Sequence, residues 1–397
     1  MLLTVSKRLE FSASRRLYDP RLSAQENVAR FGAESAARYG TGRNYVAYFV
    51  FSGTVTPETG MLMNLSEIKG RVGQVIDDGF DHKFLNEDNP TFAEMAPTAE
   101  NVARQLFTET EPLFRDAAAQ LVACHLQETE TRSATVYASG LCEANYWFEF
   151  SAARQTMSPR LTSAENERLF GIAASPFGHG HNYRARVTLG ADTPDCQIVE
   201  VLRSTRMALD HKNLNLEVAG MKDRPVTTES LAAYIFEKVA SEVPIERIRL
   251  HERDDFFAEY WKDSKYFLGM RHAFHAAHRL HAPALSTEEN AELFGRCNSP
   301  RGHGHGYLAE ATIGGSLDAR SGTLYPFTSL AEGMASGLEP WQDKHLDLET
   351  DEFRQTPSTG ENIVQALWHR LNPRLDQGLT RLRLWETPNN RFTLRRG

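Results

Sequence analysis

Residues 299–307 read SPRGHGHGY and residues 175–183 read SPFGHGHNY, so one chain carries nearly the same phrase twice. The corresponding stretch near the start, residues 38–45, reads RYGTGRNY and contains no histidine. A phrase that recurs at wide spacing calls for a search for internal repeats before any other interpretation, because repeats decide the fold.

Three phenylalanines align the copies: Phe11 in FSASRRL, Phe150 in FSAARQT and Phe274 in FHAAHRL. A Glu-Asn pair follows each of them after 15 residues, a Phe-Gly pair after 20, and a tyrosine after 33 or 34. Two glutamates complete each copy, at Glu100, Glu229 and Glu361 and again at Glu128, Glu252 and Glu386. The shared offsets predict three units of ordinary domain size, with bounds at 1–138, 139–263 and 264–397.

Each unit shows the same order of local patterns. It opens with an alternating run such as LTVSKRLEFSA and continues to a second strand pattern that ends in glycine. Two helical patterns follow, and short apolar runs such as IERIRLHE end two of the units. The order predicts an α+β unit, ββααββ, with an antiparallel sheet. Such a sheet has open edges, and three joined units can pair these edges into a ring.

Composition limits the classes of function. The net charge of -8 argues against a general nucleic-acid surface, and no run approaches the ~20 apolar residues of a membrane span. The start carries no signal-peptide pattern. The four cysteines are scattered, which favours a reducing compartment. We therefore expect a cytoplasmic protein with no membrane and no nucleic-acid partner.

The third unit carries a metal-ligand pattern. His303 and His305 are two residues apart at the start of a strand, so both side chains point to one face. His278 lies on the preceding strand, in phase with Phe274 and Ala276. Three neutral histidines with a vacant fourth position are typical of a catalytic zinc site. We predict that these three histidines bind one Zn²⁺, against the alternative that they only form hydrogen bonds in a loop.

The other units lack this set. The second unit keeps His179 and His181 but has Arg154 in place of His278, and the first unit has Arg15 and Arg43 at two of the three positions. Arginine keeps its proton and cannot ligate a metal, so we expect one metal per chain and only a partial site in the second unit. The arginines either fill the vacated space with a fixed positive charge or form surface salt bridges.

Cys297 lies six residues before His303, and neither other unit has a cysteine at the equivalent place. A thiol beside a divalent cation loses its proton more easily and can act as a base. The alternative for a single free cysteine is a small buried apolar residue.

The first two units carry a different feature, an aspartate-histidine pair. Asp81-His82 precedes Glu100 by 19 residues, and Asp210-His211 precedes Glu229 by the same number. Counting 19 residues back from Glu361 leads to Gln342-Asp343 in the third unit. A carboxylate beside a histidine can orient the ring for proton transfer. His345 is close to this position but two residues late. The chemistry is therefore split: the unit with the ligands and the thiol lacks the pair, and the units with the pair lack the ligands or the thiol.

The phrases FHAAHRL, ENAELFGRCNSPRGHGHGY, LDHKNLN, TTES and WETPNN resemble the 6-pyruvoyltetrahydropterin synthases and their relatives, the 6-carboxytetrahydropterin synthases. The resemblance covers essentially the whole chain as three tandem copies. It implies three tunnelling-fold units that close into one antiparallel β-barrel with helices outside, and a stack of two such rings, here a homodimer of pseudo-trimers.

The resemblance also implies residue roles and a reaction. His278, His303 and His305 hold zinc, Cys297 is the base, an aspartate-histidine pair is the proton relay, and Glu386 binds the pterin ring. Because family sites span an interface, Asp81-His82 or Asp210-His211 would complete the third unit's site, giving one composite site per chain. The expected enzyme is a carbon-oxygen lyase of tetrahydrobiopterin biosynthesis that releases triphosphate from 7,8-dihydroneopterin triphosphate. The alternatives are a 6-carboxytetrahydropterin synthase and a pterin-binding scaffold without catalysis.

Overall fold

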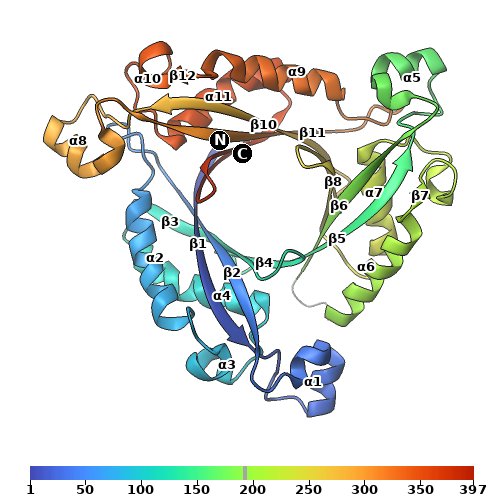
Figure 1. Ribbon diagram of the computed structural model, residues 1–397, viewed down its shortest axis with the longest axis horizontal. Coiled ribbons are helices and arrows are strands. Elements are labelled where there is room, and N and C mark those ends of the chain that lie inside the picture. Colours follow the sequence, from blue (N-terminus) through green and yellow to red (C-terminus); the bar gives the residue numbers. More distant parts are fainter. Residues whose placement is uncertain (191–194) are drawn as a thin grey trace.

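A computed structural model of the chain, described for residues 1–190 and 195–397, is a ring with three corners (Figure 1). The strands line the centre and the helices lie outside them, and the two chain ends lie close together near the centre. This arrangement confirms the predicted α+β ring.

The three units repeat the same succession of elements. The first contains β1 (Leu2–Arg15), α1 (Ala24–Phe31), β2 (Thr41–Gly53), α2 (Leu65–Gly79), α3 (Leu85–Asp88), α4 (Ala99–Thr110), β3 (Ala119–Gln127) and β4 (Arg132–Tyr137). The second contains β5 (Cys142–Arg154), α5 (Ser163–Phe170), β6 (His179–Gly190), α6 (Asp195–Leu209), β7 (Lys212–Asn213), α7 (Thr228–Ala240), β8 (Arg247–Arg253) and β9 (Phe256–Trp261). The third contains β10 (Tyr266–His278), α8 (Thr287–Phe294), β11 (His303–Gly315), α9 (Phe327–Leu338), β12 (Lys344–His345), α10 (Leu346–Glu349), α11 (Gly360–Arg374), β13 (Leu379–Thr387) and β14 (Asn390–Arg395).

Antiparallel pairing closes the long strands into a barrel. The order runs from β11 through β13, β14 and β1 around to β10, which pairs with β11 again. The units join edge to edge through the pairs β4–β5, β9–β10 and β14–β1. Full closure removes the open edges that a single unit would expose. The short strands β7 and β12 add parallel pairs at the ends of β5 and β10.

The recurring Glu-Asn pair builds the loop between the first two strands of each unit. Its glutamate forms a capping box with a serine or threonine at the start of α1, α5 and α8. Its asparagine is buried, and its side chain forms hydrogen bonds with main-chain groups of the same loop. The Asn290 amide accepts the N–H of Ala282 at 2.7 Å and donates to the carbonyls of Ala282, Leu285 and Ser286 at 3.0–3.1 Å.

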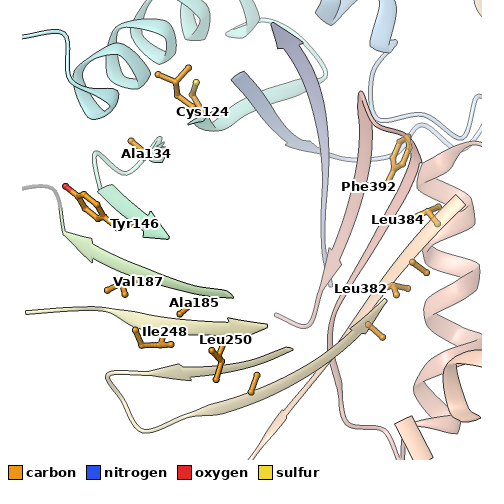
Figure 2. Packing of buried hydrophobic residues seen from close by; sticks show 14 of the residues in the cluster. Cys124, Ala134, Tyr146, Ala185, Val187, Ile248, Leu250, Leu382, Leu384 and Phe392 are labelled. Atoms are coloured by element: carbon orange, nitrogen blue, oxygen red, sulfur yellow. The ribbon is translucent and has the colours of Figure 1, made fainter. Parts of the chain in front are cut away.

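The recurring phenylalanine and tyrosine pack against each other under the helices. Phe11 stacks on Tyr45, Phe150 on Tyr183 and Phe274 on Tyr307, with ring centres 4.8–5.0 Å apart. Buried apolar residues alternate along the barrel strands, as Figure 2 shows for Leu382, Leu384 and Phe392. Because successive strand residues face opposite sides, the intervening residues face the lumen. Among the described residues, no helix is both long and apolar enough to cross a membrane.

Replacing Asn290 with alanine removes four hydrogen bonds and leaves buried main-chain groups of the loop unpartnered. We expect the melting temperature of the Asn290→Ala variant to fall by about 3–8 °C, measured by differential scanning calorimetry. Glu292→Ala on the exposed face of the same helix is the control. A melting temperature unchanged in Asn290→Ala would contradict this role for the Glu-Asn pair.

Candidate metal and pterin site at the third corner

The predicted ligands come together where β10 ends and β11 begins. His278 and His303 are partners in the strand register, and His305 lies two residues along the same face of β11. One ring nitrogen from each of the three histidines lies within 4.8 Å of the other two. The Nε2 atoms of His278 and His303 are 3.2 Å apart.

The donor chemistry of this cluster fits a cation. Nδ1 of the fully buried His278 lies 2.8 Å from the carbonyl oxygen of Ser358, which can only accept, so His278 carries its proton on Nδ1. Its Nε2 therefore presents a lone pair to the cluster, and Nδ1 of His303 is buried without a hydrogen-bond partner in the described chain. Burial lowers the pKa of His303 and of His305, which keeps both rings neutral as a metal requires.

The side-chain carboxylate of Asp347 holds the first ligand in place through its hydrogen bonds. Asp347 accepts the hydroxyl of Ser358 at 2.8 Å and the N–H of Arg279 at 2.7 Å. It thereby fixes the carbonyl that orients His278, as is usual behind metal-binding histidines. Sequence reasoning missed this role because Asp347 belongs to none of the aligned motifs.

The geometry of the turn requires a glycine at position 302, just before the first histidine of HGH. The φ of Gly302 is +69°, and a Cβ atom there would lie 2.7 Å from the carbonyl oxygen of His278 and 2.7 Å from Nε2 of His345. Only glycine adopts this conformation at so close an approach. The turn sets His303 opposite His278.

One carboxylate, Glu386, lies next to the histidines, and its charge acts on a second one, Glu361. Glu386 on β13 places Oε1 3.8 Å from Nε2 of His278 and 4.0 Å from Nε2 of His305. Glu361, in the first turn of α11, is buried and accepts the N–H of Leu62 at 2.9 Å. Leu62 belongs to the first unit, so this site spans the junction of the first and third units. Burial raises the pKa of Glu361 to about 7.

Glu361 is the second of the three glutamates that recur in each unit, but its role in the site was not predicted from the sequence. Nothing in the sequence indicated that the main chain at Leu62 reaches it. A second contact at the same junction, from the Thr359 hydroxyl to the carbonyl of Gly60 at 2.6 Å, fixes the approach of this segment.

Cys297 lies in a short 3-10 turn (Gly295–Asn298) between α8 and β11. It is half-buried, and its carbonyl accepts the N–H of Leu280 at 3.0 Å. Burial raises the pKa of its thiol, and the negative charge of Glu386 raises it further. A cation among the histidines would oppose both effects.

In the first two units, arginine neutralises the glutamate that corresponds to Glu386. Arg154 forms an ion pair with Glu252, whose other oxygen lies 3.0 Å from Nε2 of His181. Arg15 likewise pairs with Glu128, and Arg43 lies 3.7 Å from the same carboxylate. Arg15 and Arg154 are only 2% and 3% exposed. These are buried ion pairs, so the surface salt-bridge alternative is wrong for Arg15 and Arg154, whereas Arg43 also pairs with the partly exposed Glu34 at 2.7 Å.

The two aspartate-histidine pairs adopt one geometry. Asp81 accepts the N–H of Ser12 and Asp210 that of Ser151, each at 2.8 Å, and both histidines have positive φ. The side chains of His82 and His211 are 85% and 82% exposed. Figure 1 shows the ends of β1, β5 and β10 at three separate corners. One copy of the chain therefore does not bring either pair to the histidines of the third unit.

Gln342 and Asp343 occupy the corresponding place in the third unit. Gln342 accepts the N–H of His275 at 3.2 Å, and Asp343 has the positive φ of His82 and His211. His345 pairs with Ala277, a register position filled by Asn213 in the second unit. His345 is therefore not a displaced member of the pair, and it lies instead against Gly302.

The comparison with known families now has a geometry to match. The sequence model of the family described as "6-pyruvoyl tetrahydropterin synthase" matches residues 4–139, 144–263 and 268–397. The chain belongs to this family. Its three matches place nearly the whole chain in three copies of the synthase family's unit.

Individual members of the 6-pyruvoyl tetrahydropterin synthase family match one third of the chain. The 6-pyruvoyl tetrahydrobiopterin synthase of Drosophila melanogaster is 40% identical over 132 residues, 32% of this chain and 79% of the relative. The Homo sapiens protein of that name is 38% identical over 122 residues, 30% of this chain and 84% of the relative. The solved 6-pyruvoyl tetrahydropterin synthase of Caenorhabditis elegans is 33% identical with a TM-score of 0.33, and covers 34% of this chain and 96% of that one.

The buried ion pair of the second unit generates a stability prediction. Burial disfavours ionised Glu252, but the charge of Arg154 and hydrogen bonds from His181 and Thr228 outweigh it and hold the pKa of Glu252 well below its usual range. The pair therefore stabilises the fold above the unfolded pKa of the carboxyl, and this contribution is lost as pH falls.

Arg154→Met leaves Glu252 buried without its arginine, and we expect a loss of about 3–5 kcal/mol at pH 7. The loss should shrink toward pH 4, where the isolated carboxyl takes up a proton. Denaturant unfolding across this pH range measures it, with Arg160→Met on a neighbouring exposed loop as control. A deficit independent of pH would contradict the assignment.

Proposed function

We propose that the chain is a zinc-dependent 6-pyruvoyltetrahydropterin synthase-like lyase with one active site per chain, at the third corner. The observation that carries this proposal is the contrast between the three equivalent glutamates. Glu128 and Glu252 are neutralised by buried arginines, whereas Glu386 lies beside His278 and His305 of the histidine cluster. Within the described residues, only the third corner combines a full histidine set with a carboxylate that no arginine occupies.

Each residue of the corner has a role in this proposal. His278, His303 and His305 would hold Zn²⁺, which when bound polarises the side-chain hydroxyl groups of the substrate and acidifies the adjacent C–H bonds. Cys297, as thiolate, removes a carbon-bound proton. The histidine of an aspartate-histidine pair passes a second proton between the side chain and the ring.

The pterin ring would be held by carboxylates. Glu386 accepts hydrogen bonds from the amino group and a ring nitrogen of the pterin, a two-point contact that a neutral acceptor matches poorly. Glu361 accepts the N–H of Leu62, so the main chain of the first unit contributes one wall of the site. Their contact supports an active site at the junction of units.

The reaction balances without an external oxidant. One carbon-oxygen bond of 7,8-dihydroneopterin triphosphate breaks, and the electron pair leaves on triphosphate. The proton taken by Cys297 and the proton moved by the histidine shift hydrogen from the side chain to the ring. The ring is thereby reduced to the tetrahydro level, and the side chain becomes a diketone.

The proton relay would come from a second copy of the chain. His82 and His211 are exposed at the first and second corners, and Asp343 stands at the equivalent place in the third. A second ring stacked on the first can place an exposed pair over the third corner of its partner. We therefore propose a homodimer with composite sites.

All four cysteines are unpaired, which supports a cytoplasmic location.

The separation of the pairs from the histidines in one chain also favours a second candidate, a pterin-binding protein without turnover. That protein would bind the pterin at Glu386 and leave it unchanged. A 6-carboxytetrahydropterin synthase-like reaction is distinguished by the mass of the product.

Cys297→Ala removes the proposed base and leaves the histidines in place. We expect kcat with 7,8-dihydroneopterin triphosphate to fall by about 10²–10⁴-fold, with zinc content near one per chain by elemental analysis. His303→Ala should lose both zinc and turnover. Cys196→Ala, at an exposed cysteine of α6, is the matched control. Full turnover in Cys297→Ala or His303→Ala would defeat the proposal.

Mixed dimers test where the relay comes from. A chain with Cys297→Ala and a chain with His82→Ala and His211→Ala are each expected to be inactive. If sites form between chains, random mixing of the two should restore roughly a quarter of wild-type activity, because half of the dimers carry one intact site. If the relay lies within one chain, the mixture stays inactive. Wild-type activity in the double histidine variant would instead show that neither pair takes part.

A further inference from the structure

Each junction between units is a pair of antiparallel strands, and one register position in each pair carries residues that differ from junction to junction. One residue of each couple lies four positions after the last glutamate of its unit, and the other lies four positions before the aligned phenylalanine of the next unit. The couples are Arg132 and Tyr146 at the first junction, Phe256 and Met270 at the second, and Asn390 and Lys7 at the third. The three junctions are therefore equivalent in backbone and different in chemistry.

At the first two junctions this couple does not bind the carboxylate of the last glutamate. Arg132 places its guanidinium 4.2 Å from the ring centre of Tyr146 and pairs with Glu100. The couple at the second junction is apolar and buried. Among the described residues, the side chains of neither couple form a hydrogen bond with the last glutamate of the unit, which an arginine of the corner neutralises instead.

At the third junction two hydrogen bonds join the couple to the last glutamate. Nζ of Lys7 donates to Oδ1 of Asn390 at 2.8 Å, and Nδ2 of Asn390 donates to Oε2 of Glu386 at 3.2 Å. Lys7 lies on β1 of the first unit, whereas Asn390 and Glu386 lie on β14 and β13 of the third. A side chain of the first unit is thus linked to the carboxylate that lies beside the histidine cluster.

The chemistry of the three groups allows only one orientation of the Asn390 amide. An ammonium group can only donate hydrogen bonds, and a carboxylate can only accept them. An amide between the two forms both hydrogen bonds only when its oxygen faces Lys7 and its nitrogen faces Glu386. The reversed amide would place its oxygen against the carboxylate and its N–H groups against the ammonium. Lys7 therefore holds the amide, and the amide holds the carboxylate.

The charges around this chain of hydrogen bonds also act on one another. Burial lowers the pKa of Lys7, the positive charge of Lys69 on α2 lowers it further, and the negative charge of Glu386 acts in the opposite direction. Lys69 is exposed and forms no hydrogen bond or ion pair within the described residues. Removing Lys69 therefore removes a nearby positive charge without breaking the hydrogen bonds that lead to Glu386.

We propose that Lys7 is a positioning residue for pterin recognition, which acts through Asn390 to fix the Glu386 carboxylate for its two-point contact with the ring. This inference rests on the proposed function and gives the first unit a part in it. A carboxylate has about four acceptor positions, so the bond from Asn390 leaves both oxygens free to accept from the pterin. The reacting carbons belong to the side chain of the substrate, away from the amino group that Glu386 would bind. Lys7 should therefore affect binding and not kcat.

The first test measures binding of 7,8-dihydroneopterin, which lacks the leaving group, by titration calorimetry. We expect Lys7→Met to bind it about tenfold more weakly than wild type, and KM for 7,8-dihydroneopterin triphosphate to rise in proportion, with kcat changed by less than about twofold. Lys7→Arg keeps a charged donor and should restore most of the affinity. Lys69→Met is the matched control and should bind as wild type does. Equal losses in Lys7→Met and Lys69→Met would show a general effect of charge and overturn the proposal.

A double-mutant cycle tests whether Lys7 acts through Asn390. Asn390→Leu breaks both hydrogen bonds, so adding Lys7→Met to it should weaken binding by less than about twofold more. Two full and independent losses, or wild-type affinity in either single variant, would overturn the proposal. Asn390→Leu alone decides the question if Lys7→Met does not fold. A wild type that neither binds 7,8-dihydroneopterin nor turns over its triphosphate would defeat the proposed function itself, whereas a wild type that binds as tightly as Lys7→Met defeats only this inference.

Discussion

A carboxylate buried under each corner must be neutralised, and the rest of the structure follows from how each unit meets that requirement. Leaving Glu128, Glu252 or Glu386 unpaired in a low-dielectric site would cost several kcal/mol. The first unit neutralises its carboxylate with Arg15, and the second uses Arg154 with help from His181. In the third unit Glu386 accepts a hydrogen bond from the Asn390 side chain at 3.2 Å and faces imidazoles, and neither balances its charge unless a cation binds among the histidines. One constraint met in three ways thus separates two structural corners from the corner that we propose as the active site.

Fusion of three units into one chain makes this division possible. Identical subunits would have to carry the same residues at all three corners, whereas here each junction has its own contacts. At the first junction Arg132 pairs with Asp195 at 3.3 Å, at the second Glu229 accepts the N–H of Leu324 at 3.0 Å, and at the third Glu361 accepts that of Leu62. Glu100, Glu229 and Glu361 are equivalent, and each is followed by the last glutamate of its unit. Among the described residues, only in the third unit is that last glutamate, Glu386, without an arginine partner. The two other units then serve as barrel wall, and the first also contributes to the corner that we propose as the active site.

The repeat offsets in the sequence were sufficient for the ring, because strand alternation and edge closure are local rules applied three times. They also placed His278, His303 and His305 on one face, because side chains along a strand alternate between two faces and neighbouring strands keep the same faces. The location of His82 and His211 could not be predicted, because spacing along the chain does not say which corner a loop reaches. The buried state of Arg15 and Arg154 depends on carboxylates more than 90 residues away. The arginines that face the lumen were not predicted, because the alternation of apolar and polar residues in a closed barrel is the same as in a sheet with one exposed face.

Strand register links the two charged regions of the molecule. On β11, His303, His305 and Tyr307 face the helices, while Glu310 faces the lumen, and on β13 Glu386 and Arg383 divide in the same way. A slip of one residue in the pairing of β11 with β13 would exchange these faces, sending a histidine into the arginine-rich lumen and an arginine into the apolar layer. An arginine in the apolar layer would be a buried charge without a partner, and the histidine would be removed from its cluster. Apolar residues of β11 and β13, such as Ala309 opposite Leu384, fix this register. The same pairing of strands therefore sets the positions of the side chains at the corner and of those in the lumen.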